Sequence, residues 1–407
     1  MLLKPETNVK AEILTRGVVF TQAALERSMK DNAKGQNMVY NAPLGGEVGR
    51  PQELFLQGHD GYITVVSCVS AHHFTSPVKV DVTTQGELAC FIDDECMTNE
   101  VQVSFVPQPD YYFKKLANGD FVKKYISACG YDELNIIPWK GCFISKACKF
   151  CGVNIVATQN DTNSMHAFNL SRYESLWDES KEEYLANLSD SIEYALQSEC
   201  YSEHMHVIII SGNLSDKMLD KQSDIYCDIV SHIKDQIKDK TTEGVIAVIT
   251  PPKDDARLQK LKDAGVEIVV FNLEVGNEPW FSKYCPGKSH LGRDFFIDKL
   301  KQAVKVFGRG KAWTNFVLGL EPIEPLLELC DELASHGIVS SANVLHLDEG
   351  NRLDCKPPSK EDVVTFFYQL SEINKKYGFD AFYCSKALRT SLSNEMHDGR
   401  FILVTTV

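Results

Sequence analysis

The sequence contains no long apolar run. Its first residues, Met1 to Glu6, lack the apolar core of a signal peptide, and no later run approaches the ~20 apolar residues of a membrane-spanning helix. Basic residues are also scarce: 42 Lys and Arg stand against 56 Asp and Glu, for a formal net charge of −14. Because phosphate backbones require clustered Lys and Arg, this charge argues against a broad nucleic-acid surface and leaves only a local basic groove open. We therefore expect a cytoplasmic protein without a membrane partner.

Cysteines are gathered at one place only. The chain has 13 cysteines, and outside that place they are scattered singly. We interpret most of the scattered ones as small buried apolar side chains. Their positions are Cys68, Cys90, Cys96, Cys129, Cys200, Cys227, Cys285, Cys330, Cys355 and Cys384.

Three cysteines lie within ten residues, at Cys142, Cys148 and Cys151. They follow a strand-like apolar run, Leu134 to Trp139, and therefore occupy the loop that leaves this strand. In a reducing compartment, cysteines this close together are metal ligands more often than structural thiols. Three thiolates suit an iron–sulfur cluster that keeps one iron free for a second cofactor. The alternatives are unrelated buried thiols and a zinc site, which would need a fourth ligand from elsewhere in the chain.

An aromatic residue, Phe150, stands directly before the last of the three cysteines. The order resembles the cluster loop of the radical S-adenosylmethionine (radical SAM) superfamily, although five residues separate the first two cysteines where most of that family has three. The resemblance implies that Cys142, Cys148 and Cys151 hold a [4Fe-4S] cluster. It also implies that S-adenosylmethionine (SAM) binds the remaining iron and that Phe150 lies near its adenine. The segment Ser341 to Leu353 resembles the sixth-strand segment of the biotin synthase and HydE-like branch.

Residues 1 to 130 differ from the rest of the chain. Short runs of β-forming residues, at Tyr62–Cys68, Val78–Thr84 and Val101–Val106, are separated by glycine-containing turns. We predict a β-rich α+β module with one short helix near Gln22–Lys34 and another near Phe121–Cys129. The module is either a recognition element for a substrate or partner, or a structural cap.

From residue 131 to 378, apolar strand-like runs alternate with amphipathic helices. Together with the strand before the cysteines they make six strand–helix units, which predicts a parallel sheet with right-handed crossovers. The expected fold class is α/β: a partial (β/α)6 barrel of the radical SAM type, with residues 379–407 as a C-terminal extension. The cysteine loop follows the first strand, at the edge where such sheets place their chemistry. The other strands are predicted at His206–Ser211, Gly244–Ile249, Val266–Asn272, Trp313–Leu318 and Ile338–Leu347, and the helices at Ser175–Gln197, Lys217–Lys238, Asp255–Ala264, Asp294–Phe307, Ile323–Ser335 and Lys360–Lys376.

The resemblance also implies residues that hold SAM. Ser211, Gly212 and Asn213 stand where the family has a glycine-rich turn for the methionine amine. Gly212 would let the backbone come close to the ligand. The usual acidic residue of that turn is missing, and Asn213 or Asp216 is its possible substitute. The alternative is a plain strand-to-helix turn.

Later turns supply further candidates. Asn272 and Glu274 match a position that binds the ribose hydroxyls or the amine, because an ionised Glu is a strong acceptor for both. Arg293 matches an arginine that pairs with the SAM carboxylate, which suits a guanidinium fork. Asn343 and His346 would face the substrate or the adenine. A solvated loop carboxylate and a surface arginine are the alternatives for Glu274 and Arg293.

The activity that the resemblance implies follows from the cofactors. A [4Fe-4S] cluster, reduced by a flavodoxin- or ferredoxin-type donor, would cleave SAM to methionine and a 5′-deoxyadenosyl radical. This radical would take hydrogen from a small molecule or a cofactor precursor.

Several points stay open at this stage. Cys384 could donate a hydrogen atom or bind a second cluster, with a buried thiol as the favoured alternative. There is no second compact cysteine set and no cobalamin-domain motif. The alternative functions are a sulfur-inserting or metallocofactor-maturing enzyme of the biotin synthase or HydE type and, from another class, a non-catalytic SAM- or cluster-binding protein.

Overall fold

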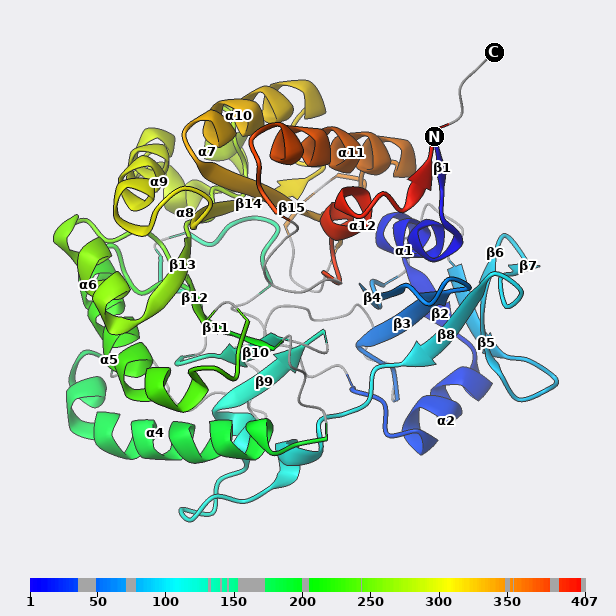
Figure 1. Cartoon of the computed structure of the whole chain (residues 1–407), viewed down its shortest axis with the longest axis horizontal. Helices are drawn as coiled ribbons and strands as arrows, with labels where there is room; N and C mark the ends of the chain where they lie inside the picture. Colours follow the sequence, from blue (N-terminus) through cyan, green and yellow to red (C-terminus); the bar gives the residue numbers. More distant parts are fainter. Residues whose placement is uncertain are drawn as a thin grey trace. The chain divides into compact units, whose positions relative to one another are not determined.

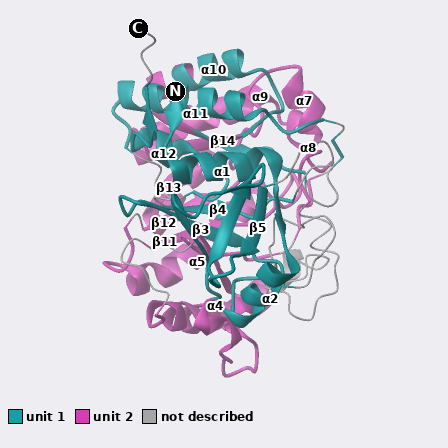
Figure 2. Ribbon diagram, turned by 90° about the vertical axis from the view of Figure 1, so that its right-hand side faces the viewer, with its two compact units in different colours: residues 1–108, 317–331, 341–407 teal, residues 109–316, 332–340 magenta. Residues whose placement is uncertain are grey.

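The computed structural model describes residues 1–35, 49–70, 78–130, 133–139, 141–144, 146–152, 173–199, 205–242, 244–347, 352–353, 355–380 and 388–403. The chain forms two compact units, one of residues 1–108, 317–331 and 341–407 and one of residues 109–316 and 332–340 (Figure 2). Among the described helices, none combines the length and the apolar character needed to cross a bilayer.

The largest sheet has seven strands in the order β15–β14–β13–β12–β11–β10–β9. Neighbouring strands from β10 to β14 are parallel, and β9 pairs with β10 in the antiparallel sense. In the described residues the sheet is open, with β9 and β15 as its edges. The predicted α/β class and its six consecutive strand–helix units are confirmed. The bounds are β9 Ile126–Cys129, β10 Glu133–Ile136, β11 His206–Ile210, β12 Val245–Val248, β13 Val266–Val270, β14 Ala312–Leu318 and β15 Ile338–Val344.

Helices alternate with these strands and follow one another around the sheet. Helices α5, α6 and α9 lie next to each other along β11 to β13 (Figure 1). Helix α5 buries Ile225, Ile229 and Ile233 on one face, which is the spacing of a helix packed on a sheet. The bounds are α4 Tyr173–Leu196, α5 Leu219–Ile237, α6 Ala256–Ala264, α7 Trp280–Tyr284, α8 Pro286–Ser289, α9 Arg293–Phe307, α10 Ile323–Ser335 and α11 Lys360–Lys376.

The N-terminal module contains two small sheets, with strand orders β2–β5–β6–β7 and β4–β3–β8. Helix α1, which the sequence did not predict, packs on β3 and β4. The helix predicted at Phe121–Cys129 is wrong. A short 3-10 turn, Val122–Lys124, is followed there by strand β9, because Ile126–Cys129 pairs with β10 along the sheet edge. The bounds are α1 Pro5–Arg16, β2 Val18–Phe20, α2 Gln22–Lys30, β3 Glu53–Gly58, β4 Ile63–Ser67, β5 Val78–Val82, β6 Leu88–Ile92, β7 Glu95–Cys96 and β8 Val101–Phe105.

Both ends of the chain belong to the same compact unit. Strand β1 (Leu2–Leu3) pairs with β16 (Phe401–Ile402) in the antiparallel sense. Lys10 of α1 forms a fully buried ion pair of 2.7 Å with Glu395 of α12 (Ser393–His397). The divisions at residues 130 and 378 stay a prediction, whereas these contacts tie the last described residues to the first helix and strand.

Candidate functional site

The cysteine loop leaves the carboxyl end of β10 and is held by the connection that follows β11. The indole Nε1 of Trp139 donates a hydrogen bond of 2.6 Å to the carbonyl oxygen of Gly212. The backbone N–H of Phe143 donates one of 2.7 Å to the carbonyl oxygen of Asn213. Cys142, between these two anchors, is half-buried. The loop therefore lies at the edge of the sheet where the sequence placed it.

Gly212 is needed because the loop passes very close to it. A Cβ atom on Gly212 would lie 2.2 Å from the carbonyl oxygen of Gly141 and 2.8 Å from the Cα of Cys142, so no side chain fits. The sequence predicted a close backbone approach at Gly212, to a bound amine. In the structure the close neighbour is the backbone of the cysteine loop.

The other side of the loop rests on the α7–α8 segment. The backbone N–H of Lys149 donates a hydrogen bond of 2.9 Å to the carbonyl oxygen of Tyr284. A Cβ atom on Gly287 would lie 1.9 Å from the carbonyl oxygen of Lys146. Gly212 and Gly287, from two different connections, thus leave the space that the backbone of the cysteine loop occupies.

The thiols of the loop have different surroundings. Burial raises the pKa of the Cys142 thiol, against backbone N–H groups of Ile144 and Asn213 that favour its thiolate. The N–H of Asn213 lies 3.4 Å from Sγ of Cys142. The Cys148 thiol has a lowered pKa, first because the Cys285 thiol donates a hydrogen bond to it and then because Lys288 is near. Cys148 is therefore the more readily ionised of the two.

Cys285 is a site residue that the sequence analysis missed. It was grouped with the scattered cysteines, yet it is fully buried and its Sγ faces that of Cys148. The hydrogen bond to Cys148 and burial raise the pKa of Cys285 well above its usual value. The only signal in the sequence was its place in a turn after the fourth predicted strand, at the same sheet edge as the cysteine loop.

Lys288 is a second missed residue, and it forms a buried ion pair. Its Nζ donates hydrogen bonds of 2.9 Å to the Glu274 carboxylate and 2.7 Å to the carbonyl oxygen of Asn272. Burial alone would lower the pKa of Lys288, but Glu274 and the thiols of Cys148 and Cys285 raise it. Lys288 therefore carries a fixed positive charge beside the thiols.

The backbone of Glu274 is strained. Its φ of 70° is in the left-handed region, which is costly for a non-glycine residue, and its N–H donates a 2.9 Å hydrogen bond to Asn315. The Asn272 side chain accepts hydrogen bonds of 3.2 and 3.3 Å from the backbone and side-chain nitrogens of Asn315. The structure thus brings Asn272 and Glu274 next to the cysteine loop, and it engages both with protein partners.

The remaining predicted SAM contacts near β11 and α9 also have protein partners. Asn213 Oδ1 accepts a hydrogen bond of 2.5 Å from Thr250 Oγ1, and Ser211 Oγ lies 2.9 Å from the hydroxyl of Tyr226. Arg293, at the start of α9, donates to the carbonyl oxygen of Gly276 and, at 3.1 Å, to Asp294.

Asp216 has an incompletely satisfied carboxylate. Its Oδ2 lies 2.6 Å from Nε2 of His290, while Oδ1 is buried without a hydrogen-bond partner among the described residues. Of the two possible substitutes for the missing acidic residue, Asp216 therefore keeps a buried acceptor available.

Phe150, the predicted neighbour of the adenine, is half-buried.

Two predicted residues lie elsewhere. Asn343 is exposed on β15 in the other compact unit, where its Oδ1 accepts a hydrogen bond of 2.7 Å from Thr390. His346 of the same unit lies 3.2 Å through Nδ1 from the carbonyl oxygen of Val344. Cys384 falls outside the described residues.

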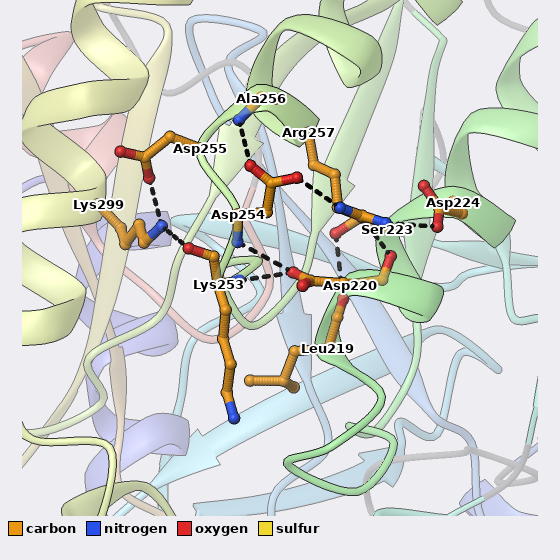
Figure 3. A network of polar contacts seen from close by, with 10 residues as sticks. All are labelled: Leu219, Asp220, Ser223, Asp224, Lys253, Asp254, Asp255, Ala256, Arg257 and Lys299. Carbon is orange, nitrogen blue, oxygen red and sulfur yellow. Dashed lines mark hydrogen bonds and ion pairs between the residues drawn. The ribbon is translucent and has the colours of Figure 1, made fainter.

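The connections that follow β11 and β12 are fixed to each other by a polar network (Figure 3). The Asp220 carboxylate accepts hydrogen bonds from the backbone nitrogens of Lys253 and Asp254, at 2.7 and 3.2 Å. Arg257 pairs with Asp224 at 3.1 Å and with Asp254 at 2.7 Å. The network joins the first turns of α5 to the residues that lead into α6, and Asn213 and Thr250 lie in the connections before these two helices.

The donor set fits an iron–sulfur cluster in its chemistry. Three thiols on one loop, a buried cation and a buried carboxylate oxygen without a partner are the groups that a cluster and a zwitterionic ligand would use. Within the described residues, however, no three His, Cys, Asp or Glu side chains converge as a metal site.

Comparison with known proteins gives partial matches. No protein-family model matches the chain. The bacteriochlorophyllide c C-7(1)-hydroxylase of Chlorobaculum limnaeum is 32% identical over 120 residues, which are 29% of this chain and 30% of that protein. The chain thus matches less than a third of the length of this curated relative.

Solved structures give weaker similarities. A radical SAM methyltransferase from Sphaerobacter thermophilus is 12% identical with a TM-score of 0.43, covering 76% of this chain and 77% of that one. Methylornithine synthase (PylB) is 12% identical with a TM-score of 0.39, covering 61% and 65%. Coproporphyrinogen III oxidase (HemN) from Escherichia coli is 12% identical with a TM-score of 0.37, covering 64% and 55%. At these TM-scores the similarity does not support a function for this chain.

Proposed function

We propose that this chain is a radical SAM enzyme in which Cys142, Cys148 and Cys151 hold a [4Fe-4S] cluster. The observation that carries the proposal is the cysteine loop itself. It brings three thiols to the carboxyl end of β10, and two glycines, Gly212 and Gly287, make room for it. Three closely spaced thiolates would bind three irons of the cluster and leave the fourth without a protein ligand. A second cofactor can chelate that fourth iron.

The residues around the loop suit the charged end of SAM. Lys288 presents a buried cation that an anionic carboxylate would meet, and Arg293 is the second candidate for that role. The Oδ1 of Asp216, which has no hydrogen-bond partner within the part of the chain that the structure describes, would accept a hydrogen bond from the ammonium group, with Asn213 and Glu274 as further candidates. When bound, the cluster supplies the electron that splits SAM into methionine and a 5′-deoxyadenosyl radical, which takes hydrogen from the substrate.

We propose a small molecule with an unactivated C–H bond as the substrate. The curated relative is named for hydroxylation at a carbon atom, which is the kind of position that such a radical attacks. Assignment to the biotin synthase and HydE-like branch, with Cys384 and Asn343 in substrate-related roles, is a narrower proposal.

The test uses protein that is purified and reconstituted anaerobically with iron and sulfide. We expect about four iron atoms per chain, loss of the cluster when Cys142, Cys148 and Cys151 are all changed to alanine, and 5′-deoxyadenosine from SAM after reduction. Cys96→Ala removes an exposed cysteine elsewhere and serves as the matched control. A normal cluster in the triple variant would contradict the proposal.

The same samples separate the alternative functions. Iron and sulfide well above about four per chain would favour the sulfur-inserting or metallocofactor-maturing type, which uses an auxiliary cluster. A SAM-binding cluster that never yields 5′-deoxyadenosine would favour the non-catalytic protein.

A further inference from the structure

The cysteine loop and the α7–α8 segment together present a cationic and aromatic surface, which we call the lysine patch. It consists of Phe143, Lys146 and Lys149 from the loop, and Lys283 and Tyr284 from α7. Phe143 is 46% exposed, Lys146 and Lys283 are exposed, and Lys149 and Tyr284 are half-buried. Lys283 Nζ lies 4.6 Å from the centre of the Tyr284 ring, so charge and aromatic surface are combined in one place.

The lysine patch is continuous because its two segments are joined through their backbones. The N–H of Lys149 donates to the carbonyl oxygen of Tyr284 at 2.9 Å. The carbonyl of Lys146 lies against Gly287, where a Cβ atom would be 1.9 Å from its oxygen. These two contacts hold the loop firmly on α7 and α8.

The lysine patch lies directly outside the thiols. Cys148 stands in the chain between Lys146 and Lys149, and Cys285 follows Tyr284. The thiols of Cys148 and Cys285 are themselves hydrogen-bonded to each other. A protein that covers the patch therefore also covers the part of the cysteine loop that carries Cys148.

The charge of the lysine patch contrasts with that of the whole chain. The formal net charge is −14, yet three lysines gather here within two short segments. Glu278, which precedes α7, accepts hydrogen bonds from the N–H and hydroxyl of Ser282 at 3.2 and 2.9 Å. A strongly acidic chain repels an acidic protein over most of its surface, so a local cationic patch fixes where such a protein approaches.

We infer that the lysine patch is the docking surface for an acidic one-electron carrier protein of the flavodoxin type. The inference rests on the proposed function, because reductive cleavage of SAM takes one electron that the chain has to receive from outside. The reduced carrier would lose one electron on the patch, and a cluster held by the thiols of the loop would gain it. Redox encounters use small interfaces, below about 1,200 Å², and depend on charge complementarity for their rate, which matches one aromatic-centred group of lysines.

The experiment follows reduction of the reconstituted full-length protein by reduced flavodoxin in a stopped-flow instrument. In the wild-type protein the second-order rate falls steeply as salt is raised. Changing Lys146, Lys149 and Lys283 together to glutamate lowers the rate at low salt by roughly tenfold or more and removes most of its salt dependence. Phe143→Ser lowers it by a smaller factor, since it removes apolar contact and no charge.

The matched control changes Lys234, Lys260 and Lys305, which are exposed on α5, α6 and α9, to glutamate. This variant has the same net charge as the patch variant and keeps a rate within about twofold of wild type. Single Lys→Gln changes at the three patch positions are used if the triple variant loses its cluster.

Reduced methyl viologen, a small cation, separates this inference from the proposed function. The patch variant still forms 5′-deoxyadenosine from SAM with this reductant, while flavodoxin-dependent formation is lost. The inference is overturned if flavodoxin reduces the patch variant as fast as wild type, if the control variant slows equally, or if the wild-type rate is insensitive to salt. Failure of every reductant to yield 5′-deoxyadenosine from any variant would instead count against the proposed function.

Discussion

Two regions of the molecule bury an ion pair, and they do so in different ways. In the unit that contains both chain ends, Lys10 and Glu395 are fully buried, and Lys10 Nζ also donates to Thr64 at 3.0 Å and to Leu388. Beside the cysteine loop, Lys288 and Glu274 have side chains that are 7% and 19% exposed. The described residues give Lys288 two acceptors, with thiols nearby.

The difference separates a structural charge from the one that we propose binds SAM. All three donors of the Lys10 ammonium group are used by the fold, across sequence separations of up to 385 residues. The Lys288 pair joins residues only 14 apart in sequence, within one turn region that also carries Cys285. A pair that closes the fold should affect stability when broken, whereas a pair beside a reactive loop should affect binding.

Breaking the structural pair gives the largest expected effect. Lys10→Met leaves Glu395 buried without its partner, which lowers the free energy of unfolding by about 3–5 kcal/mol. Urea denaturation measures this loss, and Lys30→Met, at an exposed position of α2, is the control. The double variant Lys10→Met/Glu395→Leu should recover much of the loss, because an apolar pair leaves no charge unpaired. A loss below about 1 kcal/mol in the single variant would remove the distinction between the two regions.

Obstructing the close approach at the cysteine loop comes next. Gly212→Ala forces the loop away from the β11 turn, which costs about 1–3 kcal/mol of stability and lowers the iron content after reconstitution. Gly35→Ala is the matched control, because no atom lies within 4 Å of the added Cβ. Equal iron content in the two variants would show that the loop does not need this contact.

Removing the proposed SAM-binding cation, Lys288, has a smaller effect, and the affinity for SAM is the quantity that changes. Lys288→Met removes a charged hydrogen-bonding group and weakens SAM binding about tenfold, while Lys288→Arg keeps part of the affinity. Equilibrium binding to the reconstituted protein measures it. Folded Lys10→Met protein should bind SAM as the wild type does. If Lys288→Met bound SAM normally and only unfolded more easily, both ion pairs would be structural.

The smallest effect concerns the Cys148–Cys285 contact. In cluster-free protein the lowered pKa of Cys148 and the raised pKa of Cys142 mean that Cys148 becomes a thiolate at lower pH. Alkylation by iodoacetamide, followed by mass spectrometry, should therefore label Cys148 at lower pH than Cys142.

Cys285→Ala removes the hydrogen bond to Cys148. The midpoint pH for alkylation of Cys148 should then rise by about one unit or less. Cys96→Ala should leave the curve in place. An unchanged curve in Cys285→Ala would show that the contact does not favour the thiolate.

Much of the sheet could be predicted from local sequence. β11 and β12 are apolar runs, and β13 is apolar except for Glu267. Helices Ile323–Ser335 and Lys360–Lys376 were predicted with their observed bounds because each shows one apolar face. The predicted helix at Phe121–Cys129 failed because pairing with β10 decides the structure of Ile126–Cys129, and that pairing is not visible in the segment itself.

The site was predictable only where residues are close in sequence. The cysteine loop could be found from its spacing, whereas Cys285 and Lys288 join it through contacts between distant turns. The sequence singled out Asn272, Glu274 and Asn213 but not their partners Asn315, Lys288 and Thr250, which come from other connections of the sheet. Which acceptor is left without a partner, as at Asp216, depends on packing that no local pattern records.

The pairing of β1 with β16 has a consequence for biosynthesis. A ribosome releases Leu2 and Leu3 first, but their partners Phe401 and Ile402 only after about 400 further residues. Until then Lys10 of α1 also has no Glu395 to pair with. The unit that contains α1 therefore stays incompletely folded while the strand–helix repeats are synthesised. Completion of this unit therefore requires residues 395 to 402, and a nascent chain stalled before residue 395 should stay open to proteases around α1.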